Sequence, residues 1–264
     1  MASEKTRRAH VLGFPVDLLT PQRVRQAIEQ ALADPWDGCC RHVVTLNPEY
    51  VMSARHDAAF AVGIRSADLV TADGVGIALA IRLDRHARAA GIGRLTGVDV
   101  IGWLTEMSEP LHAPLFLLGA GPGVAEDAAA ALRQRHPGAA IAGVWGDGTP
   151  EPQHDREAMA RIVASGAEVV AVAYGAPGQV LWIERNRAAL ANAGVRLAIG
   201  VGGSFDFFAG RVPRAPSYVR RLGLEWLYRL LREPWRWRRQ AVLPAFAIFV
   251  LREQIKRRLT AARS

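Results

Sequence analysis

The chain has 264 residues, half of them hydrophobic, and a formal net charge of +8. This length and apolar content allow one large α/β domain with an appendage and exclude wholesale disorder. The two cysteines, Cys39 and Cys40, are adjacent, which excludes a disulfide framework or a Cys-x-x-Cys metal pair and is typical of a reducing cytoplasm. The N-terminus lacks the apolar stretch of a secretory signal, and no apolar run reaches the ~18–20 residues of a membrane-spanning helix.

Six short apolar runs divide the first 205 residues. Their continuous hydrophobicity is typical of strands that are covered on both faces of a sheet. The runs are "HVVTL" (42–46), "ADLVT" (67–71), "PLFLLG" (114–119), "AIAGVW" (140–145), "EVVAVAY" (168–174) and "VRLAIGV" (195–201).

Stretches of helical character lie between most of these runs. One begins with Thr20 as the N-cap and Pro21 at the first helical position, and another ends at Pro137 and Gly138. This alternation predicts an α/β fold with a mainly parallel sheet and helices on both faces.

The C-terminal segment differs from this core in charge and pattern. From Arg211 onward the sequence has 14 Lys and Arg against 3 Glu, a net charge of +11, whereas the preceding residues carry −3. Val219, Leu222, Trp226 and Leu230 recur at helical spacing, Pro234 ends or kinks that helix, and a second helical run follows it. We therefore expect a core at residues 1–210 and a basic helical appendage at residues 211–264. The charge of the appendage predicts an anionic partner, which the pattern leaves open between a nucleic acid, a phosphate-bearing substrate and an acidic membrane face.

Polar residues follow four of the predicted strands. Because ligands bind at the carboxyl ends of the strands in such sheets, one shared crevice is expected there. Asn-Pro and Asp-Gly are also ordinary turn formers, so each position has a purely structural alternative. The candidate residues are Thr45, Asn47, Asp73, Gln179 and Asp206.

The glycines at Gly119, Gly121 and Gly123 follow a predicted strand and precede a helix. The third glycine of a dinucleotide-binding G-x-G-x-x-G pattern would fall on Val124, so the match to an NAD site is weak. The loop can instead bind a phosphate at the helix N-terminus or have no ligand. No P-loop, nucleophile elbow or His, Cys and Asp cluster occurs, so neither a metal nor a cofactor is expected, and His42 is expected in the core or at a sheet edge.

Arginine and tryptophan alternate in the appendage. Arg229, Arg236 and Arg239 are seven and three residues apart, which places them near one face of a continuous helix. Guanidinium groups suit the recognition of phosphate oxygens. The rings of Trp226, Trp235 and Trp237 favour a membrane–water interface, and the alternative is a solvated basic face with packing tryptophans.

Seven motifs, taken in chain order, resemble the WecG/TagA/CpsF family of glycosyltransferases. They cover most of the chain from residue 10 to about residue 245. They are "TLN" (45–47), "ADGVG" (72–76), "RLTGVD" (94–99), "GAPGQ" (175–179), "GVGGSFD" (200–206), "RAP" (214–216) and "LEWLYRLLREPWR" (224–236).

The resemblance implies a Rossmann-like core and an inverting transfer of a sugar, of the N-acetylmannosamine, glucose or uronate type. The donor would be a UDP-sugar and the acceptor a sugar on undecaprenyl diphosphate, in cell-surface polysaccharide synthesis such as that of teichoic acid or exopolysaccharide. The enzyme would be cytoplasmic, peripheral on the inner face of the membrane, and would not bind nucleic acid. The sequence leaves open whether it forms a homo-oligomer. Asp73 matches the family base, whereas Thr45, Asn47, Arg94 and Gln179 match pocket residues. The appendage arginines Arg229, Arg236 and Arg239 also match.

One motif departs from the family pattern. Many members have Lys-Gln-Glu where this chain has Gly178, Gln179 and Val180, which affects the choice of donor or acceptor. A base on the acceptor hydroxyl and cations on the leaving diphosphate are what such a transfer needs, and Asp73 and the tail arginines can supply them.

Two other classes of protein remain as alternatives. One is a Rossmann-type nucleotide- or nucleic-acid-binding protein with a basic tail, and the other is an NAD-dependent reductase. Binding to anionic liposomes or to oligonucleotides in a salt series separates the first from a transferase, and a nicotinamide titration separates the second. Seven ordered motifs favour the transferase.

Overall fold

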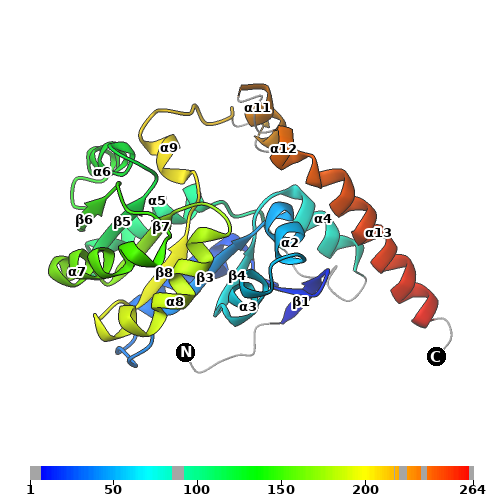
Figure 1. The fold of residues 1–264 in the computed structure, drawn as a ribbon, viewed down its shortest axis with the longest axis horizontal. Coiled ribbons are helices and arrows are strands. Elements are labelled where there is room, and N and C mark those ends of the chain that lie inside the picture. The colour runs from blue at the N-terminus through cyan, green and yellow to red at the C-terminus, as the bar shows by residue number, and fades with distance from the viewer. Residues whose placement is uncertain (1–6, 85–91, 217, 220–224, 233–236, 262–264) are drawn as a thin grey trace.

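The structure is a computed structural model that describes residues 7–84, 92–216, 218–219, 225–232 and 237–261. Within these ranges one sheet has six parallel strands in the order β4-β3-β8-β7-β5-β6 (Figure 1). Each of the six predicted runs overlaps one strand, and helices flank the sheet, so the predicted α/β, Rossmann-like fold class is confirmed. The strands are β3 (Arg41–Leu46), β4 (Leu69–Ala72), β5 (Leu115–Gly119), β6 (Ile141–Trp145), β7 (Val169–Ala173) and β8 (Leu197–Gly200).

Apolar side chains on both faces of the strands bind the helical layers to the sheet. In β7, Val169 and Ala171 pack in one core cluster, whereas Val170 and Val172 pack in another on the opposite face. The first cluster involves α1 (Pro21–Ala33), α5 (Gly97–Ser108), α6 (Val124–Arg135) and α9 (Ser204–Phe208). The second involves α7 (Asp155–Ser165), which follows the short 3-10 helix η1 (Pro152–His154), and α8 (Gly178–Asn192). Alternate burial therefore explains why the strands read as continuous apolar runs.

Local signals set the first helix as the sequence predicts. The side chain of Thr20 accepts a hydrogen bond from the backbone of Arg23 at 3.3 Å, and Pro21 is the first residue of α1. Pro137 and Gly138 follow the end of α6 at Arg135. The predicted start of α1 and the predicted stop after α6 are confirmed.

A β-hairpin near the N-terminus was not expected from the sequence. Its strands are β1 (Arg8–Val11) and β2 (Phe14–Asp17), and they pair antiparallel through a turn at Leu12 and Gly13, which both have positive φ. Asp17 joins the hairpin to the sheet by accepting hydrogen bonds from the backbone of Val70 at 2.8 Å and from Arg8 at 2.8 Å. The Leu-Gly turn lacks the Asn or Asp that usually identifies a two-residue hairpin.

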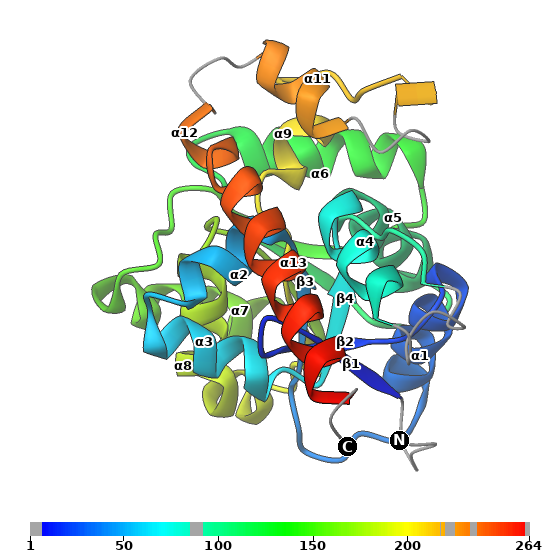
Figure 2. The ribbon, with the colours of Figure 1, turned by 90° about the vertical axis from the view of Figure 1, so that its right-hand side faces the viewer.

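The last helix packs against the core through part of its length. α13 (Val242–Ala261) lies against α2 (Pro48–Ala54) and α4 (Val75–Leu83) (Figure 2), and α3 (Ala58–Ser66) packs on α2. Phe246 and Val250 of α13 are buried in a third core cluster, together with side chains of α2, α3 and α4. A Cβ at Gly76 would lie 2.7 Å from Pro48, so glycine is required where α4 meets α2.

Polar contacts also attach α13 to the core. Glu253 accepts a hydrogen bond from the backbone of Leu12 at 3.1 Å, and Arg257 pairs with Asp84 at 2.8 Å. Two shorter helices, α11 (Glu225–Arg232) and α12 (Trp237–Gln240), precede α13. None of the helices in the described part of the chain is long and apolar enough to span a bilayer. The proposed boundary at residues 210 and 211 stays a prediction.

A buried histidine lies at the edge of the sheet that faces away from the strands' carboxyl ends. His42 of β3 is buried, as expected for a core position, and its Nδ1 lies 2.6 Å from Glu184 of α8. Burial raises the pKa of Glu184, but the hydrogen bond and charge of His42, with Ser66 and Arg187, outweigh this and hold the pKa below its usual 4.5. The pair therefore ties α8 to the sheet most strongly when Glu184 is ionised.

Replacing Glu184 with Gln is expected to lower the free energy of unfolding at pH 7 by about 1 kcal/mol, since a hydrogen bond to a charged group is lost. The folded-state pKa of Glu184 is lowered, so its contribution is present above pH 4.5 and is lost as the pH falls through the folded value. Urea unfolding of the two proteins should therefore converge at acidic pH. Glu157→Gln, which removes an exposed ion pair with Arg161, is the control and should change little. A difference that does not narrow on acidification would contradict this account.

Candidate active site

A cleft of about 1020 Å³ opens at the carboxyl ends of the strands. The crossover connections of a parallel sheet place these ends at one edge, where ligands bind. Helices α4, α11 and α13 also contribute to its walls. All six candidate residues that precede the appendage line this cleft, namely Thr45, Asn47, Asp73, Arg94, Gln179 and Asp206.

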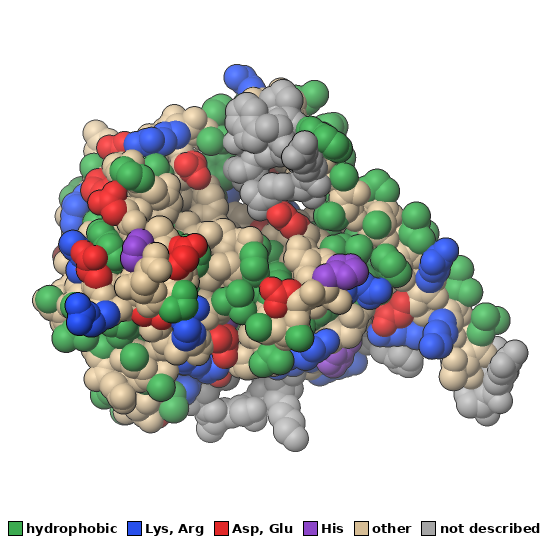
Figure 3. Space-filling model, viewed as in Figure 1, with side chains coloured by type: hydrophobic (Ala, Val, Ile, Leu, Met, Phe, Trp, Pro, Cys, Tyr) green, Lys and Arg blue, Asp and Glu red, His purple; other side chains and the backbone are tan. Residues whose placement is uncertain are grey.

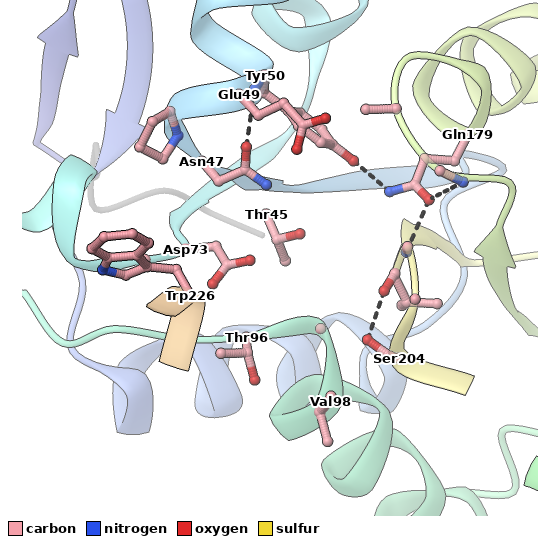
Figure 4. Close-up of a pocket in the computed structure, with 18 of the residues that line it drawn as sticks. Thr45, Asn47, Glu49, Tyr50, Asp73, Thr96, Val98, Gln179, Ser204 and Trp226 are labelled. Carbon is pink, nitrogen blue, oxygen red and sulfur yellow. Dashed lines mark hydrogen bonds between the residues drawn. The ribbon is translucent and has the colours of Figure 1, made fainter. Parts of the chain in front are cut away.

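Thr45 and Asp73 come from the neighbouring strands β3 and β4. Thr45 pairs in register with Thr71, and its hydroxyl donates to the carbonyl of Gly200 at 3.5 Å. The backbone N–H of Asp73 donates to Leu46 at 2.8 Å, which extends the ladder past the end of β4. Figure 4 shows both side chains directed into the same open space. Asp73 is thereby held by backbone pairing at the floor of the cleft.

Asn47 has a structural contact and also lines the cleft. It caps α2, and its Oδ1 accepts a hydrogen bond from the backbone of Tyr50 at 2.9 Å. The side-chain nitrogen points toward the cleft (Figure 4). The side-chain oxygen of Asn47 thus has the structural role of a helix cap, whereas its side-chain nitrogen is directed at the space where a ligand could bind.

Gln179 is the most enclosed of the candidates, with only 1% of its surface exposed. Its Oε1 accepts hydrogen bonds from the backbone of Gly202 at 2.9 Å and of Gly175 at 3.1 Å, and its Nε2 donates to the hydroxyl of Tyr50 (Figure 4). These bonds join the ends of β7 and β8 to α2. The contacts of Gln179 with the chain itself give it a positioning role in the cleft wall.

The motif "RLTGVD" forms the start of α5. The Thr96 side chain accepts from the backbone of Asp99 at 3.3 Å, and Asp99 accepts in return from the backbone of Thr96 at 3.2 Å, which is a capping box. A Cβ at Gly97 would lie 2.9 Å from the carbonyl of Val201, so this helix start can only approach β8 with glycine there. The motif therefore sets the position of the backbone on one side of the cleft.

Both ends of this motif pair with residues nearer the C-terminus. Arg94 forms an ion pair with Glu225, the first residue of α11, and Asp99 pairs with Arg214 at 2.5 Å. Burial raises the pKa of Asp99, but hydrogen bonds from Arg214 and Thr96 outweigh it and hold the pKa below its usual value. The Arg94–Glu225 pair holds the start of α11 at the cleft, and the Asp99–Arg214 pair holds the segment after α9 against the start of α5.

Helix α9 and a glycine-containing loop also contribute to the cleft. Asp206 lies in the first turn of α9. Gly119, Gly121 and Gly123 all have positive φ, and Gly121 lines the cleft. The glycine loop therefore turns at the cleft rim directly before α6, where backbone N–H groups are available to an anion.

The appendage residues are described only in part. Arg229 lies in α11 and Arg239 in α12, but their side chains are outside the described part of the chain, and Arg236 and Trp235 lie outside it altogether. Trp237 is exposed. Trp226, for which the sequence favours a membrane interface, lines the cleft and is 36% exposed, and its contact with a membrane stays a prediction.

Two residues of the site were missed by sequence reasoning. Tyr50 follows Asn47 in "TLNPEY" and bonds to Gln179, and Glu225 lies in "LEW" and bonds to Arg94. Their place within motifs was the available signal, but their partners are more than 120 residues away. In the described ranges no three His, Cys, Asp or Glu side chains cluster so as to hold a metal ion.

Comparison with known proteins gives a family. The model of the glycosyl transferase WecG/TagA/CpsF family matches residues 9–260. An N-acetylglucosaminyldiphosphoundecaprenol N-acetyl-beta-D-mannosaminyltransferase of Bacillus subtilis (strain 168) is 34% identical over 213 residues, covering 80% of this chain and 79% of the relative. The protein of the same name from Bacillus spizizenii (strain ATCC 23059 / NRRL B-14472 / W23) is 34% identical over 212 residues, with the same coverage. The chain belongs to the WecG/TagA/CpsF family of glycosyl transferases.

Replacing Gln179 with Met keeps the volume but removes the acceptor for two backbone N–H groups and the donor to Tyr50. We expect the free energy of unfolding to fall by about 2–4 kcal/mol, because buried polar groups lose their partners. Urea unfolding measures this change. Gln30→Met on the exposed face of α1 is the control. Unchanged stability together with lost activity would show instead that Gln179 acts on a substrate.

Proposed function

We propose that the protein transfers an N-acetylmannosamine-type sugar from a UDP-sugar to N-acetylglucosamine on undecaprenyl diphosphate. Glucose or uronate donors of the same class are the alternative. The names of the two Bacillus relatives support this acceptor, and family membership supports glycosyl transfer. The observation that carries the proposal is the cleft, in which six residues from five motifs meet at one edge of the sheet. The product would enter the synthesis of a cell-surface polysaccharide, such as teichoic acid.

Asp73 is the proposed general base. In a single inverting displacement the acceptor hydroxyl oxygen bonds to the anomeric carbon, while the bond from that carbon to the UDP oxygen breaks. Asp73 takes the hydroxyl proton, and UDP leaves with the bonding electron pair. The hydrogen bond between the backbones of Asp73 and Leu46 supports this role, because it holds the carboxylate at the cleft floor.

Cationic side chains are proposed to stabilise the departing diphosphate. Arg94 lines the cleft, and Arg229, Arg236 and Arg239 belong to the segment that begins where Glu225 pairs with Arg94. Guanidinium groups in a partly enclosed site stabilise developing negative charge without a metal ion. Thr45, Asn47 and Asp206 are proposed to bind the hydroxyl and amide groups of the substrates.

The outer face of α13 is proposed to lie on the inner face of the cell membrane. Ile248, Ile255 and Leu259 are exposed along this helix, and Arg252 and Lys256 lie between them in sequence. Figure 3 shows hydrophobic side chains along the outer edge of α13, with Lys and Arg beside them. Such a helix face suits an anionic lipid surface, where each basic residue contributes ~1 kcal/mol.

A panel of UDP-sugars with N-acetylglucosaminyl diphosphate lipid acceptors, read by mass spectrometry, tests the proposed reaction. We expect a disaccharide-lipid product with one preferred donor, and we expect it to form equally in excess chelator because side chains replace a metal. Transfer of sugar to water or protein alone would refute the proposed acceptor. Loss of product in chelator, restored by a divalent ion, would refute the proposed role of the arginines.

Asp73→Asn keeps the size and turn propensity of the residue but removes its proton acceptor. We expect turnover to fall by roughly 10²–10⁴-fold, the usual contribution of a general base, with donor binding and folding little changed. Steady-state kinetics and a nucleotide-binding titration measure the two effects. Asp147→Asn, a second carboxylate at the cleft, is the control. Near-normal turnover in Asp73→Asn would leave Asp73 as a turn former.

A further inference from the structure

One side of the cleft is apolar, and its walls come from two helices. On α4, Val75, Leu79 and Leu83 are four residues apart, so they lie along one face of the helix. On α13 the same spacing occurs. All six residues line the cleft, and we name this part the apolar arm: Val75, Leu79, Leu83, Leu243, Ala247 and Leu251.

The core holds both walls of the apolar arm while their side chains stay accessible. Ile77 and Ile81 of α4 and Phe246 and Val250 of α13 are buried in the same cluster. On the neighbouring helix faces, Leu79 is 50% exposed and Leu251 is 53% exposed. Leucines left open on two packed helices that face one cavity are typical of a site for an apolar ligand.

The apolar arm is continuous with the polar floor of the cleft. α4 begins two residues after Asp73, so its row of side chains starts beside the proposed base. From Val75 to Leu83 the row extends over eight residues, or ~12 Å along the helix. Figure 2 shows α13 beside α4 over this stretch. In a ligand bound along this row, the junction between the polar part and the apolar part would lie near Asp73.

We infer that the apolar arm binds the first isoprene units of the acceptor's polyprenyl chain. This inference rests on the proposed function, since the acceptor is a sugar diphosphate joined to such a chain. The match is one of chemistry, because the cleft has a polar region and an apolar region in the same order as that substrate. A nucleobase is a poorer occupant, since its polar edges need hydrogen-bond partners that six aliphatic side chains lack.

Acceptors with chains of increasing length test the assignment in the absence of membranes. For the native protein, KM for N-acetylglucosaminyl diphosphate acceptors should fall as the lipid grows from one to three isoprene units. Leu79→Ser and Leu251→Ser should each raise KM for the longest chain by roughly fivefold, from the loss of partly buried apolar contact, and should leave kcat and the KM for the shortest chain unchanged.

Leu259→Ser is the matched control, because this leucine is 59% exposed on the same helix but lies outside the cleft. It should weaken binding to anionic vesicles of phosphatidylglycerol and phosphatidylcholine and keep the dependence of KM on chain length. A KM that does not depend on chain length in the native protein, or equal effects of Leu79→Ser and Leu259→Ser, would overturn the assignment.

A photoreactive isoprenyl diphosphate without a sugar separates failure of this assignment from failure of the proposed reaction. Cross-links to peptides of α4 and to residues 243–251 would support the apolar arm even if no sugar were transferred. Cross-links confined to residues 255–259 would mean that the chain meets only the outer face of α13, and would overturn it. Absence of transfer to every acceptor would refute the proposed function alone.

Discussion

The buried amide of Gln179 is the contact on which the shape of the cleft depends. The strands β7 and β8 are followed by loops that contain Gly175 and Gly202. Gln179 accepts hydrogen bonds from both loops and donates one to Tyr50, so a single side chain fixes three segments. Gly200 has no Cβ, and one placed there would lie 2.5 Å from the amide nitrogen of Gln179. The missing side chain of Gly200 thus makes room for the amide of Gln179. Thr45 bonds to the carbonyl of Gly200 and Asn47 to the backbone of Tyr50, so both contact residues of this network.

The sheet could be predicted from the sequence because parallel strands buried on both faces are apolar throughout and need no long-range information. The hairpin β1–β2 could not, because its strands are four residues long and its Leu-Gly turn carries no usual turn signal. Asp73 could be predicted to line the site because it directly follows an apolar run, and ligands bind at the carboxyl ends of such strands. The partners of Arg94 and Asp99 did not follow from any local pattern, since ion pairs such as Arg94–Glu225 join residues 131 apart in the chain.

The apolar arm shows a second limit of sequence reasoning. Residues four apart on α4 and on α13 have the spacing of an ordinary buried helix face, and the adjacent faces of both helices are in fact buried. In the structure α13 packs against α4, yet Leu79 and Leu251 stay exposed. A helical pattern therefore indicates that a face is apolar, but it does not say whether protein or ligand covers that face.

Two of the ion pairs between the chain after residue 210 and the core, Arg94–Glu225 and Asp99–Arg214, have opposite polarity. At Arg94 the core supplies the cation and the tail the anion, whereas at Asp99 the core supplies the anion and the tail the cation. A uniformly basic tail would be attracted to an acidic surface equally well in many registers. Because these two pairs have opposite polarity, a shifted tail would bring like charges together there, and their repulsion would disfavour that register. A segment rich in arginine can thus be strongly attracted to an anionic surface and still settle in one alignment over the cleft.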